Sequence, residues 1–221
     1  MVPKGYLLLV LGFILGTGYF VHNKLMSCSK IVPKHNHTSA ALTKALDKTV
    51  TILNHNNIEY SLAYGTLLGI YRNNSPIEND DDVDIFIPSS HWKKAVEEMK
   101  KHFSPVPMPT NNASFESFIV DCVQVDFYRL TFYQDRCIDC WEHDVFQKKE
   151  MYPFTKYGKY YVPNQVEAFL RHVYGDDWKI PKNDKTSRTK ESALAHKICE
   201  NSSLSWYTII LLGIVLLIIV L

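Results

Sequence analysis

Hydrophobic positions divide the chain into two uncharged apolar ends and a patterned middle. Residues 5–21 and 206–221 are apolar runs that contain no charged side chain. Both runs lie at a terminus and lack an amphipathic period, which favours membrane-spanning segments over buried core helices. We therefore expect a signal anchor or a cleaved signal peptide within residues 1–22 and a C-terminal transmembrane segment at 206–221.

The middle of the chain predicts a stem, one folded domain and a linker. Residues 23–38 carry scattered polar side chains without apolar periodicity, as an exposed stem does. Residues 39–182 alternate between helical and extended patterns, and they suffice for a single α/β core. Residues 183–205 are expected to form a linker to the C-terminal apolar run.

Periodicity within the domain predicts an alternation of helices and strands. The first element is a helix from Ser39, its expected N-cap, to about Asn56, because apolar residues recur there every three or four positions. The pattern continues with a strand at 58–63, a short helix at 66–71, a strand at 83–87, a helix at 92–103, a β-hairpin or two adjacent strands at 115–130 and a helix at 165–174. Asn164 is the expected cap of the last helix, and Glu167 would complete a capping box.

Overall charge excludes one class of function. The chain carries 24 basic and 23 acidic side chains, for a net charge of +1, and no basic stripe. A nucleic-acid binder needs such a stripe to neutralise phosphates, so we expect no nucleic-acid partner.

The side of the membrane on which the domain lies is left open by the sequence. Three lysines follow the first apolar run, and this favours a cytoplasmic domain by the positive-inside rule. The chain also contains four Asn-x-Ser/Thr glycosylation acceptors, at Asn36, Asn73, Asn112 and Asn201. They favour a glycoprotein domain in the secretory lumen of the ER or Golgi, and this is the orientation that we expect. Five cysteines fit either compartment.

The densest charge lies in the stretch Asn79-Asp80-Asp81-Asp82-Val83-Asp84. Neighbouring aspartates repel one another, and a divalent cation offsets that repulsion. If 83–87 is a strand, Asp82 and Asp84 share one face and can bind one Mg²⁺ or Mn²⁺ ion. An EF-hand is excluded, because Ile85 stands where that loop needs glycine and Trp92 where it needs glutamate.

A third carboxylate is available on a later strand. Asp126 interrupts a run of β-branched and aromatic residues and shares a strand face with Gln124 and Tyr128. This setting favours a metal ligand over a structural ion pair with Lys or Arg.

A turn before the acidic stretch offers groups that can bind phosphate. Gly65 and Thr66 follow a predicted strand and begin a predicted helix, where backbone N–H groups and a hydroxyl can hold phosphate oxygens. Arg72, beyond that helix, can neutralise a phosphate or form an ion pair with the aspartates.

Together these motifs resemble the LicD/fukutin family of phosphotransferases. The family pattern Gly-Thr/Ser-Leu-Leu-Gly-x-x-Arg is similar to residues 65–72, and its Trp-Asp-x-Asp-x-Asp is similar to residues 79–84. Its closing signature, Val-Pro…Tyr-Gly-x-x-Trp…Pro, looks like residues 162–181. The chain departs from the family at Tyr64, where glycine is frequent, and at residues 78–79, where Glu-Asn replaces Pro-Trp.

The resemblance implies a nucleotidyltransferase fold, a mixed β-sheet with flanking helices. It implies one or two Mg²⁺ or Mn²⁺ ions, with catalytic and metal-binding roles for Asp82, Asp84 and Asp126. It also implies a CDP-linked donor, CDP-choline or a CDP-alditol, whose phospho-headgroup passes to a sugar hydroxyl of a glycan while CMP leaves. The groups implied to bind that donor are Gly65, Thr66 and Arg72.

Two other functions stay open. One is a membrane-tethered, non-catalytic relative that binds a glycan or a partner, and the other is an enzyme that transfers the nucleotide itself. The Cys137-Ile138-Asp139-Cys140 motif is interpreted as a pair of structural cysteines, because no second pair of zinc ligands lies at a suitable spacing. The aromatic and acidic segment 174–178 is interpreted equally well as an acceptor contact or as packing.

Overall fold

A computed structural model describes residues 37–106, 114–138 and 145–182. The expected terminal membrane segments, the linker, most of the stem, Cys140 and three of the four glycosylation acceptors lie outside these residues. Within the described ranges, no helix combines the length and the apolar character that crossing a membrane requires.

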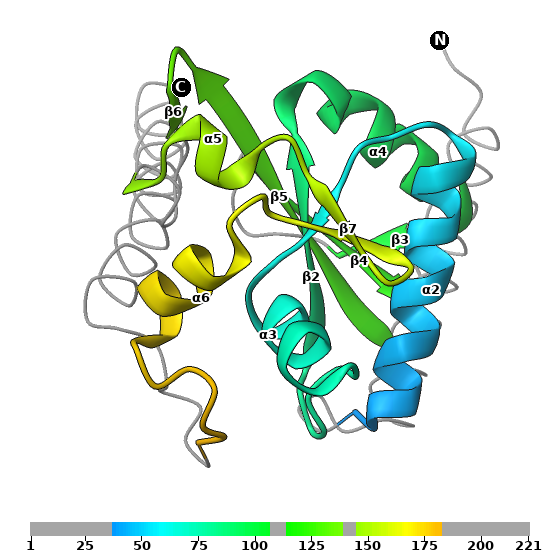
Figure 1. The fold of residues 1–221 in the computed structure, drawn as a ribbon. Helices are drawn as coiled ribbons and strands as arrows, with labels where there is room; N and C mark the ends of the chain where they lie inside the picture. The colour runs from blue at the N-terminus through cyan, green and yellow to red at the C-terminus, as the bar shows by residue number, and fades with distance from the viewer. Residues whose placement is uncertain (1–36, 107–113, 139–144, 183–221) are drawn as a thin grey trace, which may run out of the picture.

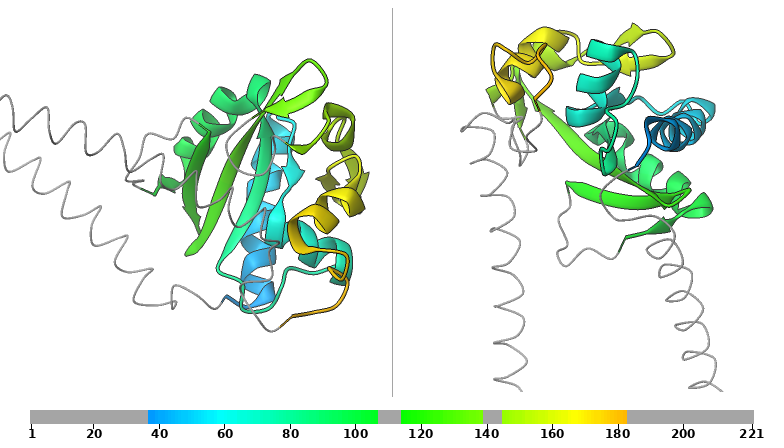
Figure 2. Two further views of the ribbon diagram at one scale, coloured as in Figure 1. Left: turned by 90° about the vertical axis from the view of Figure 1, so that its left-hand side faces the viewer. Right: turned by 90° about the horizontal axis from the view of Figure 1, so that it is seen from below.

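A mixed sheet forms the centre of the domain. Its strands lie in the order β1 (Ser61–Leu62), β2 (Asp82–Pro88), β5 (Val123–Tyr133), β4 (Phe115–Val120) and β3 (Ser104–Pro105), while β6 (Arg136–Ile138) pairs with the far part of β5. The β2–β5 pair is parallel and the other pairs are antiparallel. The expected mixed α/β architecture is therefore confirmed. Figure 2 shows these strands side by side in one layer.

Helices pack against this sheet. They are α2 (Ser39–His55), α3 (Tyr64–Asn73), α4 (Ser89–His102), α5 (Lys148–Met151) and α6 (Val166–Tyr174), and a small hairpin of β7 (Thr155–Tyr157) and β8 (Tyr160–Val162) precedes α6. Helices α2 and α4 contact each other and both contact β2 and β5. Figure 1 shows α2 and α4 on the right of the molecule and α5 and α6 on the left.

The apolar pattern of the sequence becomes the core. The buried face of α2 consists of Leu42, Ala45, Leu46, Thr49, Val50 and Leu53. Alternate residues of β2, among them Val83 and Ile85, are fully buried, as are Val125 and Phe127 at the facing positions of β5. Because side chains alternate across a strand, the residues between these positions face the other side of the sheet, where the aspartates lie.

Two predicted caps are wrong. Thr38, and not Ser39, caps α2, because the Thr38 hydroxyl accepts a hydrogen bond from the Ala41 N–H at 3.2 Å. The Ser39 hydroxyl instead lies 2.5 Å from the Ser75 hydroxyl. Helix α6 begins after Gln165 without a side-chain cap, since the Asn164 amide donates to the Lys149 carbonyl oxygen at 2.7 Å.

The predicted boundaries also change around the first strand. The expected strand at 58–63 is reduced to Ser61–Leu62, and α3 begins at Tyr64, two residues earlier than predicted. The Ala63 N–H donates to the Asp84 carbonyl oxygen at 3.1 Å, and the chain then turns directly into the helix. This early turn brings the first residues of α3 to the aspartates of β2.

Candidate functional site

Three carboxylates from two neighbouring strands converge on one face of the sheet. The parallel register of β2 and β5 places Asp84 opposite Asp126 and Asp82 opposite Gln124. Oxygen atoms of Asp82, Asp84 and Asp126 all lie within 4.8 Å of one another. The structure therefore brings together the three residues that the sequence predicts as metal ligands.

The Asp84 carboxylate is held on both of its oxygens. The Tyr128 hydroxyl donates to Oδ1 at 3.2 Å, and the Gly65 N–H donates to Oδ2 at 3.2 Å. The Asp84 N–H in turn donates to the Thr66 hydroxyl at 2.9 Å. Burial raises the pKa of the Tyr128 hydroxyl well above its ordinary value, so this group stays protonated and remains a donor.

The Asp126 carboxylate is also held by uncharged donors. The Ser117 hydroxyl donates to Oδ1 at 2.5 Å, and the Gln124 amide reaches Oδ1 and Oδ2 at 3.1 and 3.2 Å. Ser117 lies directly opposite Asp126 in the β4–β5 pair. Within the described residues Asp126 forms no ion pair, so the interpretation of Asp126 as half of a structural salt bridge is not supported.

Asp82 is the least compensated member of the group. No hydrogen bond or ion pair reaches its side chain from the part of the chain that the structure describes. Burial, and then the charges of Asp84 and Asp126, raise the pKa of Asp82 well above its ordinary value. Burial raises the pKa of Asp126 to about 6, although the bonds from Ser117 and Gln124 act in the opposite direction.

These features fit a divalent metal ion of the Mg²⁺ or Mn²⁺ type. Such ions prefer oxygen ligands, and three carboxylates supply them from rigid strands. A positive ion would also offset the repulsion that raises the pKa of Asp82, which no side-chain cation does among the described residues. A second acidic group, formed by Asp80, Asp81 and Asp82, overlaps the first at Asp82.

The predicted phosphate-binding groups divide between two places. Gly65 and Thr66 lie at the carboxylates, where both contact Asp84. The Asp80 carboxylate also lies close, because its Oδ2 is only 2.8 Å from where a Cβ on Gly65 would stand. Arg72 lies near the other end of α3, where its guanidinium donates to the Trp178 carbonyl oxygen at 3.2 Å.

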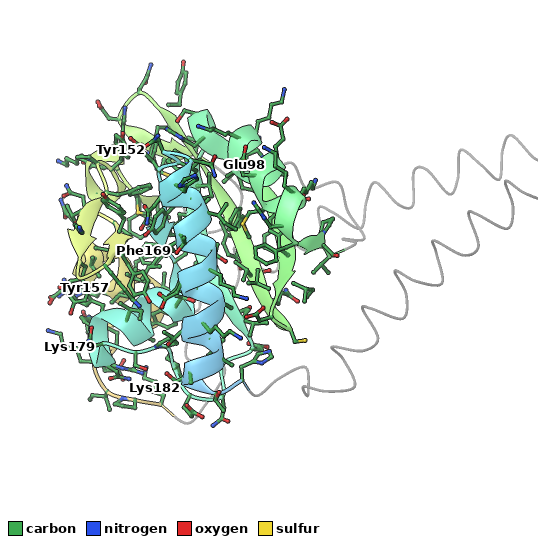
Figure 3. The ribbon with its side chains drawn as sticks, turned by 90° about the vertical axis from the view of Figure 1, so that its right-hand side faces the viewer. Glu98, Tyr152, Tyr157, Phe169, Lys179 and Lys182 are labelled. Atoms are coloured by element: carbon green, nitrogen blue, oxygen red, sulfur yellow. The ribbon has the colours of Figure 1, made fainter. Side chains whose placement is uncertain are left out.

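The closing segment 174–178 packs the domain together. Trp178 is 4% exposed, and its ring centroid lies 5.9 Å from that of Tyr71 on α3. Phe169 of α6 contacts the rings of Phe86 on β2 and Tyr64. Figure 3 labels Phe169 among the side chains of the domain. The burial of Trp178 and its contact with Tyr71 support the packing interpretation of segment 174–178.

Gly69, in the middle of α3, allows the helix to approach the loop that leads to the aspartates. A Cβ at this position would lie 2.7 Å from the Ser75 carbonyl oxygen and 2.8 Å from the Ile77 nitrogen. Both are backbone atoms, so Gly69→Ala is expected to lower the free energy of unfolding by about 2 kcal/mol. Urea denaturation followed by circular dichroism measures this change.

Gly65→Ala is the matched comparison for that experiment. The atom nearest to a new Cβ there is the end of the Asp80 side chain, which can move. We therefore expect a smaller loss of stability than for Gly69→Ala. Equal losses in the two variants would contradict a close backbone approach at Gly69.

Sequence reasoning missed several residues that support the site. Alternation places Gln124 and Tyr128 on the face of Asp126 but does not show which carboxylate each contacts. Ser117 becomes visible only from the pairing of β4 with β5. The backbone of His37 also pairs with the acidic loop, since its N–H donates to the Asp80 carbonyl oxygen at 3.1 Å and its carbonyl accepts from the Asn79 N–H at 3.0 Å. No local signal in the sequence indicates this contact.

Comparison with known proteins identifies the family. Residues 57–190 match the family model described as LicD/FKTN/FKRP, nucleotidyltransferase domain. No curated protein matches the chain in sequence.

Among solved structures, ANT(2")-Ia in complex with adenylyl-2"-tobramycin is similar at a TM-score of 0.45 and 10% identity, over 70% of this chain and 87% of that one. The lincosamide antibiotic adenylyltransferase LnuA, with lincomycin bound, is similar at a TM-score of 0.46 and 16% identity, over 70% and 93% of the two chains. Because the family model spans more than half of the sequence, the chain belongs to the LicD/FKTN/FKRP family and carries its nucleotidyltransferase domain.

Proposed function

We propose that this protein transfers a phospho-headgroup, phosphocholine or an alditol phosphate, from a CDP-linked donor to a sugar hydroxyl of a glycan, in a reaction that needs Mg²⁺ or Mn²⁺ and releases CMP. One observation carries the proposal, namely the convergence of Asp82, Asp84 and Asp126 within 4.8 Å on two adjacent strands. An intact set of carboxylates argues against a non-catalytic relative, which would have no need to keep them.

Each of the three carboxylates has a role in this proposal. Asp82, Asp84 and Asp126 hold the metal ion, which when bound neutralises charge on the donor diphosphate and on the departing CMP. Asp84 and Asp126 are fixed by their hydrogen bonds, so they present their remaining oxygen lone pairs in a set direction. Asp82 makes no such bond within the described residues, and it is the ligand that gains most from a cation.

The first turn of α3 binds the donor phosphates. Its N–H groups carry partial positive charge, which favours phosphate oxygens. The Gly65 N–H donates to Asp84 Oδ2, and in this proposal the bond is redirected to a phosphate oxygen when the donor binds. Arg72 lies at the far end of α3. To neutralise a donor phosphate, its guanidinium has to release the Trp178 carbonyl oxygen and bind the phosphate instead.

The transfer step is a substitution at phosphorus. The acceptor hydroxyl oxygen bonds to the phosphorus that bears the headgroup, and the bond from that phosphorus to the CMP oxygen breaks. The hydroxyl proton passes to Asp126, the proposed general base. The products are the phosphodiester on the glycan and CMP.

The domain faces the secretory lumen in this proposal, and the apolar terminal runs hold it beside its glycan acceptors. Two features of the described residues support the lumenal side. Cys122 is disulfide-bonded, which is typical of oxidising compartments. Asn73, a glycosylation acceptor, is exposed at the end of α3. A mass decrease on treatment of the cell-expressed protein with a deglycosylating enzyme tests this side of the membrane.

Product analysis tests the reaction itself. The full chain is incubated with Mn²⁺, a glycan acceptor and, in separate reactions, labelled CDP-choline, CDP-ribitol or nucleoside triphosphates. Headgroup transfer is expected to place the label on the glycan with stoichiometric CMP. Nucleotide on the glycan, with pyrophosphate released, would instead establish a nucleotidyltransferase. No product from any donor, with no binding of Mn²⁺, would favour the non-catalytic relative.

A further inference from the structure

We infer that Tyr128 is a positioning residue that fixes the Asp84 carboxylate in the orientation needed to bind the metal ion. Its hydroxyl makes a hydrogen bond of 3.2 Å to Asp84 Oδ1, from the strand that also carries Asp126. The inference rests on the proposed function, because it concerns the metal ligands of that reaction. It assigns a role to a residue that lies outside every motif on which the family resemblance depends.

The geometry at Asp84 leaves the carboxylate little freedom. Tyr128 engages Oδ1 and the Gly65 N–H engages Oδ2, so rotation about the last side-chain bond breaks at least one hydrogen bond. Asp84 is 5% exposed, and water therefore offers little replacement for a lost donor. Tyr128 donates from its side chain, so a substitution can remove this donor without changing the backbone.

Tyr128 is itself held in place by an aromatic cluster. It is 5% exposed, and its ring centroid lies 4.9 Å from that of Tyr64, 5.1 Å from that of Phe115 and 6.2 Å from that of Phe86. Edge-to-face packing of this kind fixes ring position as well as adding stability. The hydroxyl is consequently a fixed donor, and Asp84 adjusts to it rather than the reverse.

Tyr64 links this arrangement to a departure from the family pattern. Its φ of 36° lies in the region that glycine adopts without cost, and glycine is the frequent residue there in the family. A tyrosine in this conformation carries backbone strain, which the contacts of its ring with Tyr128, Phe86 and Phe169 offset. In this chain the ring of Tyr64 thus packs against Tyr128 and helps to hold its hydroxyl at Asp84.

Loss of the hydroxyl should weaken metal binding without unfolding the domain. Asp84 Oδ1 would lose this donor, and repulsion from Asp82 and Asp126 would then turn the oxygen away from the shared centre. Residues that orient metal ligands typically change metal affinity or activity by about 10- to 100-fold when they are replaced. The ring of phenylalanine would preserve the aromatic packing.

The test compares Mn²⁺ affinity in the full chain with and without this hydroxyl. Tyr128→Phe is expected to raise the dissociation constant for Mn²⁺, measured by isothermal titration or by electron paramagnetic resonance, by about 10-fold or more. Tyr160→Phe is the matched control, because the Tyr160 hydroxyl also donates to an aspartate, Asp47 Oδ1 at 2.8 Å, but outside the site. Its Mn²⁺ affinity should equal that of the unaltered chain.

A double variant separates positioning from general loss of structure. If Tyr128 acts through Asp84, Tyr128→Phe should reduce Mn²⁺ affinity much less in an Asp84→Asn background than in the unaltered chain. Equal reductions in both backgrounds, or Mn²⁺ affinity within twofold of normal in Tyr128→Phe alone, would overturn the inference while leaving the proposed function intact. Failure of the unaltered chain to bind Mn²⁺ would overturn both.

Discussion

Asp82→Asn is expected to lower the rate of headgroup transfer by at least about 10³-fold, because it removes the metal ligand whose charge is least compensated in the metal-free chain. Asparagine has nearly the same shape as aspartate, and no described residue depends on the Asp82 side chain for a hydrogen bond. The fold should therefore remain intact. Initial rates with labelled CDP-choline or CDP-ribitol, at saturating Mn²⁺, measure the loss, and Asp126→Asn should behave in the same way.

The same substitution is expected to stabilise the metal-free domain. Asp82 is partly buried among like charges, which raises its pKa, so its ionised form destabilises the fold at neutral pH. A neutral side chain removes this cost. We expect the melting temperature in EDTA to rise by about 2–4 °C, which corresponds to roughly 1 kcal/mol for a chain of this size.

Asp121→Asn is a matched control for both effects. Asp121 lies outside the site, and Lys48 and Lys44 hold its pKa below the ordinary value. Its substitution should therefore leave transfer unchanged and should not raise the melting temperature. Transfer that persists in Asp82→Asn, or a fall in its melting temperature in EDTA, would contradict the assignment of Asp82 as a metal ligand held among uncompensated charges.

The parts of the fold that the sequence predicts are those in which one face of an element is buried. The helical spacing in α2 and the alternation in β2 both arise from that burial, and both elements are confirmed within one or two residues. Strands β3, β7 and β8 have two or three residues each, too few for a period to appear. Strand β3 forms by pairing with β4, and β7 and β8 pair with each other across a tight turn.

The site likewise depends partly on neighbouring residues within one strand and partly on the pairing of strands that are distant in the sequence. Alternation alone places Asp82 and Asp84 on one face of β2. Their proximity to Asp126 requires the parallel pairing of β2 with β5, which brings together residues separated by more than 40 positions. Arg72 shows the limit of motif spacing, because its sequence position suits a phosphate contact but its guanidinium bonds to the Trp178 carbonyl. Only the packing of α3 against the closing segment determines that direction.

The metal-free chain is expected to become more stable as the pH falls from 7.5 to 5.5, which is opposite to ordinary acid denaturation. Burial raises the pKa of Asp126 from 3.8 to about 6 and raises that of Asp82 well above its ordinary value. An acid whose folded pKa is raised destabilises the fold when ionised, and protonation removes this penalty as the pH falls through the folded pKa. For Asp126 the shift corresponds to at most about 3 kcal/mol.

Among the described residues His37 opposes this trend, and two comparisons separate its contribution from that of the carboxylates. Burial lowers the pKa of His37, so the fold loses stability from this group as the pH falls below the ordinary histidine value of 6.5. Urea denaturation in EDTA at several pH values, for the unaltered chain and for Asp82→Asn, cancels the histidine contribution and should leave a clearly weaker gain in stability in the variant.

Saturating Mn²⁺ should reverse the pH dependence of stability, because protons then compete with the metal ion for the same carboxylates. Equal pH dependence in EDTA and in Mn²⁺ would show that these carboxylates neither repel one another in the free chain nor share a cation, and the proposed mechanism would lose its foundation.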